Sequence, residues 1–314
     1  MAATFFLLGL IFGSFLNVCI YRMPRELSVV SPGSACPACE APIAAYDNIP
    51  VLSWMLLKGK CRRCRAPISP RYAAVELLTA ALFLLSYVSA SKMANALPQQ
   101  LNFPASPNKY LVALQLCVLS FLLIGLIFTD AETKLLPDLL TKPGIVLGLL
   151  FSVFVPLDGP AQYFFHRLDN WRVISFLNSA AGAVLGSAFI MGVALLYEAV
   201  RGTEGMGRGD VKLMALIGAF LGVKLTLVVL VLGSVIGSLF GVSLILWVWL
   251  KRMARRRKRH AVEAGGVSRS RAWQSAMLIY RNFEIPFGVF LGTSALFSAF
   301  WGMALVRWYV GLYR

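Results

Sequence analysis

Histidine is nearly absent from this sequence. The 314 residues include 2 His, and these (His166 and His260) are far from the acidic motifs described below. A zinc metalloprotease needs a pair of histidines at helical spacing, so this class is excluded. No Ser–His or Cys–His arrangement for nucleophilic catalysis is evident either. Any hydrolytic chemistry must therefore rest on other side chains.

Charged residues are also scarce, at 14% of the chain, whereas 58% is hydrophobic and the mean hydropathy is +0.72. A soluble protein of this length needs far more polar surface. Apolar runs near the ~20 residues that span hydrocarbon recur along the chain. Because unpaired backbone cannot face lipid, we expect an all-α polytopic membrane protein. We predict about eight transmembrane helices, over residues 4–21, 72–90, 110–129, 139–156, 174–197, 210–223, 225–250 and 285–306.

Acidic residues are few: 14 Asp and Glu face 30 Lys and Arg, giving a net charge of +16. The excess is concentrated, with eight Lys and Arg in 22–71 and ten in 251–281. With eight spans both segments lie on the same side, which the enrichment of Lys and Arg in cytoplasmic loops makes the cytoplasm. We therefore expect an external N-terminus, a basic loop at 251–284 that contacts anionic lipid, and no nucleic-acid partner.

The domain organisation follows from these runs. Residues 1–21 read as a first transmembrane helix, without the basic start and small-residue cleavage site of a secretory signal. Residues 22–71 are long enough for a small cytoplasmic domain between helices 1 and 2, and 72–314 form the transmembrane remainder. The small-residue strings at 182–192 and 233–241 read as helix-packing faces. We predict no internal repeat.

Four cysteines stand as two Cys-x-x-Cys pairs separated by 21 residues: Cys36, Cys39, Cys61 and Cys64. Tetrahedral zinc takes four thiolates at about this spacing. The competing interpretation is two disulfides, which a reducing cytoplasm disfavours. Four cysteines close the coordination sphere, so we expect a structural Zn²⁺ that does not activate water.

Two acidic residues lie at the ends of predicted spans. Residues 205–210 read Gly-Met-Gly-Arg-Gly-Asp and end on Asp210, and Asp130 follows the span 110–129. An ionisable residue at membrane depth is a functional-site hypothesis by default. Two carboxylates that share a proton could act as an aspartyl protease, one activating water while the other holds the proton. Sequence alone does not show that they meet.

Other interpretations of these acids remain open. A phosphate-binding glycine loop would need a preceding strand and a Lys-Ser/Thr ending, and both are absent. A flexible turn before Asp210 would not need an acid at its end. Asp130 could be an ordinary residue at a helix C-terminus, but an acid there opposes the helix dipole. Asp138 follows Pro137 and reads as a helix cap or as support for the site.

Many ordered motifs along nearly the whole chain resemble bacterial type IV prepilin peptidases, which are similar to other GxGD-type intramembrane aspartyl proteases. The motifs are Gly-Ser-Phe-Leu-Asn-Val at 13–18, the cysteine pairs with the segment 47–54, the segment 68–72 with Glu76, the string from Asp130 to Asp138, residues 205–213, and Ile-Pro-Phe-Gly at 285–288. Two departures are Ala73 and Val289, each standing where the family usually has Pro.

The resemblance implies a function for these positions. Asp130 and Asp210 would be the catalytic pair, with Gly205, Gly207, Gly209, Lys212 and Asp138 as loop and support. The substrates would be prepilins and type II secretion pseudopilins in the bacterial inner membrane. Many members then methylate the new N-terminus with S-adenosylmethionine, an activity that the resemblance associates with the region of Gly59 and Lys60. The alternatives are a peptidase without methylation and a non-enzymatic membrane assembly or transport protein.

Overall fold

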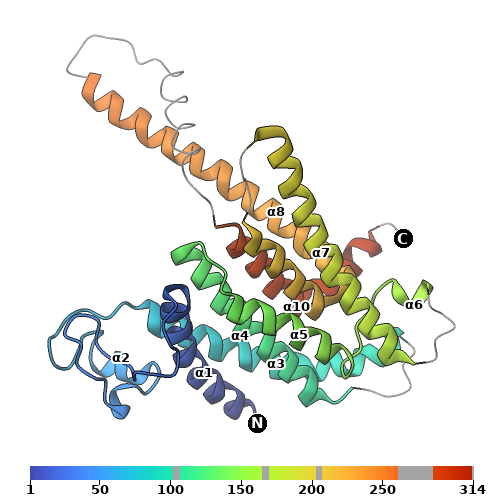
Figure 1. The fold of residues 1–314 in the computed structure, drawn as a ribbon, viewed down its shortest axis with the longest axis horizontal. Helices are drawn as coiled ribbons and strands as arrows, with labels where there is room; N and C mark the ends of the chain where they lie inside the picture. Colours follow the sequence, from blue (N-terminus) through green and yellow to red (C-terminus); the bar gives the residue numbers. More distant parts are fainter. Residues whose placement is uncertain (102–106, 165–169, 203–206, 261–285, 313–314) are drawn as a thin grey trace.

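The structure, a computed structural model, describes residues 1–101, 107–164, 170–202, 207–260 and 286–312 (Figure 1). Helices account for nearly all the regular structure in these ranges, which confirms the all-α prediction. Two isolated β-bridges lie in the cysteine-bearing segment. The α-helices are α1 (Ala2–Arg22), α2 (Leu52–Leu56), α3 (Arg71–Leu101), α4 (Lys109–Thr133), α5 (Asp138–Ser152), α6 (Ala161–Phe164), α7 (Trp171–Arg201), α8 (Arg208–His260) and α10 (Phe287–Gly311).

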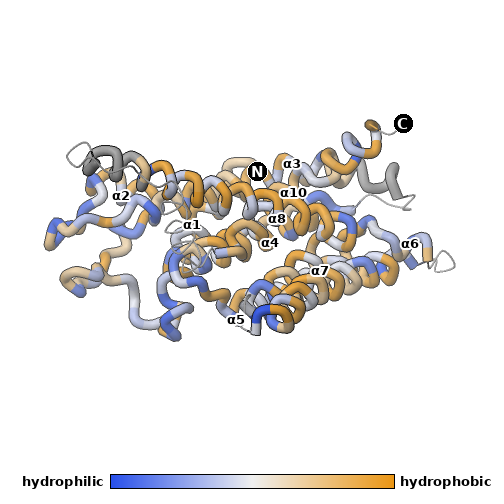
Figure 2. The backbone as a smooth tube through the Cα atoms, turned by 90° about the horizontal axis from the view of Figure 1, so that it is seen from above, coloured by the Kyte–Doolittle hydropathy of each residue, from blue (hydrophilic) through white to orange (hydrophobic). Residues whose placement is uncertain are grey.

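Six helices of the described chain are long and apolar enough to cross a membrane: α1, α3, α4, α7, α8 and α10. Their apolar stretches run through the body of the bundle in Figure 2. Large hydrophobic side chains such as Val184, Leu196 and Leu239 are about two-thirds exposed, which suits a protein whose solvent is lipid. The chain is therefore a multi-pass membrane protein, with fewer long helices than the eight predicted spans.

One difference arises at Gly222, where α8 reverses direction. Gly222 has φ 71° and ψ 178°, which is not helical. A Cβ built on Gly186 of α7 would lie 2.9 Å from the Met214 carbonyl oxygen and 3.1 Å from the Thr226 methyl carbon. In a continuous helix those two residues would be about 18 Å apart. Both halves of α8 therefore return to the same point on α7, and α8 contains the two predicted spans 210–223 and 225–250.

The other difference is α5, predicted at 139–156 as a full span. Its 15 residues measure about 22 Å, less than the ~30 Å of the hydrocarbon core. The helix is nevertheless packed inside the bundle: a Cβ on Gly148 would lie 2.8 Å from both Ala219 and Phe220 of α8. Its N-cap is Pro137, which corrects the prediction that Asp138 itself caps the helix.

The predicted small-residue faces are helix contacts for the most part. Gly182 and Gly186 of α7 face the first half of α8, and Gly233 and Gly237 of α8 face Leu291 and Phe290 of α10. Gly192, in contrast, has nothing within 4 Å of a built Cβ. Close backbone approach through small residues is a common way for membrane helices to associate.

We expect Gly182→Ala to destabilise the bundle by about 1–3 kcal/mol, the usual effect of overpacking. Its new methyl would lie 2.6 Å from the Gly218 carbonyl oxygen and 2.7 Å from the Gly222 carbonyl carbon, and backbone atoms cannot rotate away. Thermal unfolding of the purified protein measures the effect. The matched control is Gly192→Ala on the same helix, which should leave the midpoint unchanged. Equal midpoints for both variants would contradict the expected packing role.

Candidate active site and cysteine cluster

The two aspartates lie where helices end and begin, as predicted. Asp130 is in the last turn of α4, which ends at Thr133, and Asp210 is in the first turn of α8. Their exposed fractions are only 5% and 9%. A buried carboxylate in a membrane protein is costly and requires partners.

The two carboxylates meet over Gly288, at the start of α10. A Cβ built on Gly288 would lie 2.8 Å from Asp130 Oδ2 and 3.4 Å from Asp210 Oδ1. The Val289 backbone N–H donates to Asp130 Oδ2 at 3.0 Å. Three segments far apart in the sequence therefore form one site. In the sequence, Gly288 stands out only as part of a family motif. The Pro-Phe-Gly string before an apolar run is the signal that marks this helix start.

Asp138 and Lys212 tie the helices beside the aspartates together. The Lys212 ammonium donates to Asp138 Oδ1 at 2.5 Å, and Lys142 forms an ion pair with Asp138 Oδ2 at 2.7 Å. Lys212 lies two residues after Asp210, so this contact fixes the start of α8 against the start of α5. The pair is 39% and 45% exposed and lies outside the buried carboxylate site.

The glycines before Asp210 differ in their surroundings. Gly209 lies inside α8, and a Cβ there would be 3.1 Å from the Leu136 side chain. Gly207 has open space around it, with only the Gly209 nitrogen at 3.9 Å. Neither has a positive φ, so the left-handed backbone that these glycines permit is not used at either position. Gly205 lies outside the described residues.

The four predicted cysteine ligands converge. The sulfur atoms of Cys36, Cys39, Cys61 and Cys64 all lie within 4.8 Å of one another, and all four are free thiols. The Cys36 and Cys64 sulfurs are 3.8 Å apart. A tetrahedral zinc with Zn–S bonds of about 2.3 Å places its sulfurs about 3.8 Å apart, so the donor set fits zinc.

Both cysteine pairs have the same local structure, and the sequence explains why. Residues 36–43 and 61–68 share the pattern Cys-x-x-Cys-x-Ala-Pro-Ile, an internal repeat that corrects the prediction of none. In each, the first cysteine's N–H donates to the repeat's Ala carbonyl at 2.9 Å. The residue after the second cysteine, Glu40 or Arg65, has a positive φ. Each pair thus forms a knuckle closed by an isolated β-bridge.

An ion pair links the segment between the knuckles to the second knuckle. Arg62 donates two hydrogen bonds to the Asp47 carboxylate, at 2.8 and 2.6 Å. These hydrogen bonds hold the pKa of the Asp47 carboxyl below its usual range. Asp47 ends a short 3-10 helix, Ala45–Asp47, so the pair attaches this stretch to the cysteine cluster.

Gly59 and Lys60 lie immediately before the second knuckle. Gly59 is buried with φ 65°, and a Cβ there would be 3.0 Å from the Trp54 ring. The Trp54 indole N–H donates to the Ile68 carbonyl at 3.1 Å, which closes the knuckle. Lys60 is exposed. The structure therefore gives Gly59 a packing role and leaves Lys60 open to solvent.

Two polar contacts join the cysteine-bearing segment to the helices. The buried Glu76 of α3 accepts the Val51 N–H at 2.7 Å, and Val51 has a positive φ of 61°, unusual for a β-branched residue. Arg71, at the start of α3, pairs with Glu132, two residues after Asp130. The segment 22–71 is thereby connected to the helix that carries Asp130.

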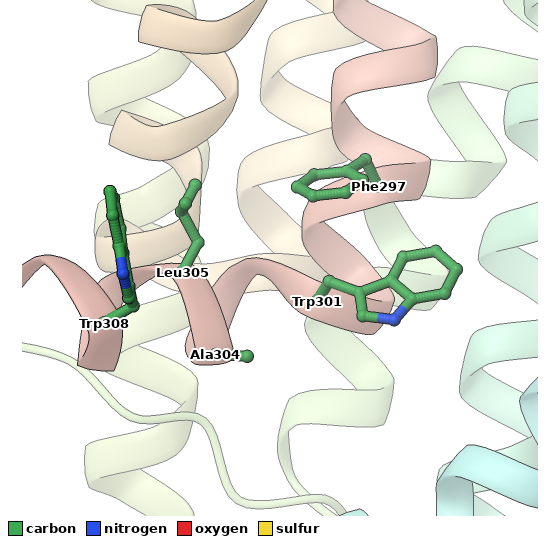
Figure 3. A pocket seen from close by; sticks show the side chains of 5 residues that line it. All are labelled: Phe297, Trp301, Ala304, Leu305 and Trp308. Atoms are coloured by element: carbon green, nitrogen blue, oxygen red, sulfur yellow. The ribbon is translucent and has the colours of Figure 1, made fainter.

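A groove at the other end of α10 is unrelated to these sites. Its volume is about 550 Å³, and apolar and aromatic side chains line it (Figure 3): Phe297, Trp301, Ala304, Leu305 and Trp308. Tryptophans gather at the interfaces of a bilayer, and this groove fits that pattern. It holds no group for hydrolytic chemistry.

Comparison with known proteins shows to which family the chain belongs. The family model "Bacterial Peptidase A24 N-terminal domain" matches residues 7–90, and "Type IV leader peptidase family" matches residues 117–242. Among curated proteins, the "Prepilin leader peptidase/N-methyltransferase" of Aeromonas salmonicida is 33% identical, over 97% of this chain and 92% of its own. Proteins of the same name from Pseudomonas aeruginosa (97% and 91% covered) and Klebsiella pneumoniae (69% and 83% covered) are 30% and 38% identical. No solved structure matches. The chain therefore belongs to the type IV leader peptidase family.

Proposed function

We propose that this protein removes the short basic leader from type IV prepilins and type II secretion pseudopilins, and then methylates the new N-terminal amine. The observation that carries the proposal is the convergence of two buried carboxylates, Asp130 and Asp210, on the start of α10. The relatives' printed names supply the substrate class and the second activity. A peptidase without methylation and a non-enzymatic membrane protein are less favoured, because the relatives are named for both activities.

The geometry supports an aspartyl mechanism. One carboxylate, in its charged form, takes a proton from a water molecule as that water attacks the scissile carbonyl carbon. The other carboxyl donates its proton to the carbonyl oxygen, and the resulting tetrahedral diol collapses with transfer of a proton to the leaving amine. The site lies at the ends of membrane helices, where the peptide bond just before a substrate's hydrophobic helix would arrive.

Burial strengthens this chemistry. Both carboxylates are largely shielded from solvent, so the interactions between them and a bound peptide act in a low dielectric. Lys212 and Asp138 support the site by holding α8 against α5. Gly209 lets Leu136 pack closely beside the start of α8.

We infer that the family's two cofactors, zinc and S-adenosylmethionine, differ in how well the described residues account for them. Cys36, Cys39, Cys61 and Cys64 would hold a zinc ion that stabilises the fold of 22–71 and has no open coordination position for water. S-adenosylmethionine would supply the methyl group. Gly59 packs on Trp54, and Lys60 is exposed to solvent. Their role in methyl transfer stays a prediction, and we derive no step from it.

We propose eight membrane crossings, in which α8 supplies two and the short α5 supplies one. With that count the N-terminus is outside, and the aspartates and the basic loop face the cytoplasm of the inner membrane. The domains would be the first helix at 1–21, the cysteine cluster at 22–71 and the peptidase at 72–314. Beyond the end of α8, the basic loop lies outside the described residues.

Incubation of the purified protein with a model prepilin and S-adenosylmethionine, read by intact mass, tests the function. We expect loss of the leader mass and gain of one methyl group on the new N-terminus. Reactions without enzyme and without S-adenosylmethionine are the controls. Leader loss without a methyl gain would remove the second activity. No mass change across several prepilins, with folded protein, would contradict the proposed function.

A further inference from the structure

The first turn of α10 directs a backbone N–H group at one of the two aspartates. α10 begins at Phe287 with Pro286 as N-cap, so Gly288 and Val289 are its second and third residues. The N–H groups of a helix's first turn have no partner within the helix. Here the Val289 N–H donates to Asp130 Oδ2 at 3.0 Å.

Among the described residues, Asp210 has no such donor. In the described part of the chain no hydrogen bond to the Asp210 carboxylate is present, although this carboxylate lies beside that of Asp130 at Gly288. Asp210 does lie in the first turn of α8, whose dipole favours a negative charge. That effect is weaker than direct hydrogen bonds to a charged group. The two carboxylates are therefore unequal.

We propose that the Val289 N–H, in the first turn of α10, keeps Asp130 as the charged member of the pair, so that Asp210 holds the shared proton. This deepens the proposed function and rests on it: Asp130 would be the base that activates water, and Asp210 the acid that protonates the carbonyl oxygen. Val289 is a positioning residue that acts through Asp130, and Gly288 lets Asp130 approach the start of α10 closely. Two like charges this close cannot both persist, so the donor decides which one ionises.

The same contact explains two features of the sequence. An acid at the C-terminus of α4 is disfavoured by that helix's own dipole, and the N-terminus of α10 offsets this. Glycine at 288 is required because a Cβ there would lie 2.8 Å from Asp130 Oδ2.

Several other charged groups at this end of the bundle are paired, whereas Arg208, in the first turn of α8, is exposed and forms no ion pair with a described residue, and Lys134 follows the last turn of α4. On α1, Arg22 donates to the Ser28 and Gly33 carbonyls; on α3, Arg71 pairs with Glu132 of α4; on α5, Asp138 pairs with Lys142 and with Lys212 of α8. The first turn of α10 carries no charged side chain. Asp210 is thus the ionisable group that meets Asp130 directly, and the ionisation of the pair should dominate the pH dependence of cleavage.

Val289→Pro removes the donor with little other change, because the first turn of a helix accepts Pro. We expect the acidic limb of the kcat/KM profile for leader cleavage to move to higher pH by about one unit, with the plateau within about twofold. The sign follows because a carboxylate that loses a donor ionises less readily, so activity is lost earlier as the pH falls. Val289→Ala keeps the N–H and should retain the wild-type limb.

A backbone ester at 289, made by incorporating the α-hydroxy analogue of valine, removes the same N–H and keeps the side chain. It should shift the limb as Val289→Pro does, and it covers the case in which proline disturbs α10. If neither change moves the limb while Asp130→Asn abolishes cleavage, the assignment of roles is wrong and the catalytic pair stands. If Asp130→Asn still cleaves, the proposed function itself fails, whatever the result at Val289.

Discussion

Asparagine at either position 130 or 210 is expected to abolish leader removal, with a loss of at least ~10³-fold in initial rate, since each removes a general acid or base. Asn is nearly isosteric with Asp but cannot take or give the proton. Both side chains are buried at the end of the bundle where α4, α8 and α10 meet, so neither water nor a neighbouring carboxylate can easily substitute for them. The measurement is the initial rate on a model prepilin, for variants at normal membrane levels.

The matched control is Asp158→Asn. Asp158 is also a partly buried aspartate, but it pairs with Lys224 beside the Gly222 turn. That turn ends the first half of α8, and Asp210 lies at the beginning of the same half. Full activity is expected for it. We also expect both inactive variants to methylate a prepilin from which the leader has already been removed, because methylation does not require the hydrolytic pair. Substantial cleavage by either Asn variant would remove that residue from the catalytic role.

Cys36→Ser is expected to empty the cysteine cluster of zinc and to unfold much of residues 22–71. Structural zinc sites in small peptides contribute about 10–16 kcal/mol, and this segment has only short helices and two β-bridges to hold it without the ion. Metal analysis should fall from about one zinc per chain to near zero, and limited proteolysis should cut within 22–71. The helices of the bundle should persist, because their packing does not involve the cluster.

Cys117→Ala is the control for loss of a thiol as such. Cys117 is buried within α4, away from the four ligands, so the zinc content should not change. Leader cleavage in Cys36→Ser is a second readout, because Arg71 connects the segment to Glu132 near the catalytic pair. A purified wild-type protein without zinc, whose four cysteines resist thiol reagents as disulfides, would overturn both the zinc site and the cytoplasmic side assigned to it.

Hydropathy predicted most of the helices because the membrane imposes their length. The predicted spans 4–21, 110–129 and 174–197 lie within α1, α4 and α7. Hydropathy was less informative where tertiary packing sets the conformation. The apolar run from 210 to 250 is almost continuous, and the reversal at Gly222 depends on the close approach of both halves to α7. The short α5 is apolar enough to suggest a full span, yet it ends at Ser152.

Local chemistry made the cysteine cluster predictable. In each Cys-x-x-Cys pair the N–H of the first cysteine donates to a carbonyl five residues later, so spacing alone suggests four converging thiolates. The Cys-x-x-Cys-x-Ala-Pro-Ile repeat is visible in the sequence as well, but it is only eight residues long. The packing role of Gly59 against Trp54 could not be predicted in this way, because it depends on which ring covers the turn.

By itself the sequence determined an all-helical membrane protein, a four-thiolate cluster, and two acids at the ends of membrane spans. Those features depend on composition and short spacings, which act through lipid solvation and local coordination. Only the tertiary structure brought Asp130, Asp210 and Gly288 together, because their approach depends on helix packing between segments more than 70 residues apart. The difference between the two carboxylates arises at the same level, because it comes from a third helix, α10, whose Val289 N–H donates to Asp130.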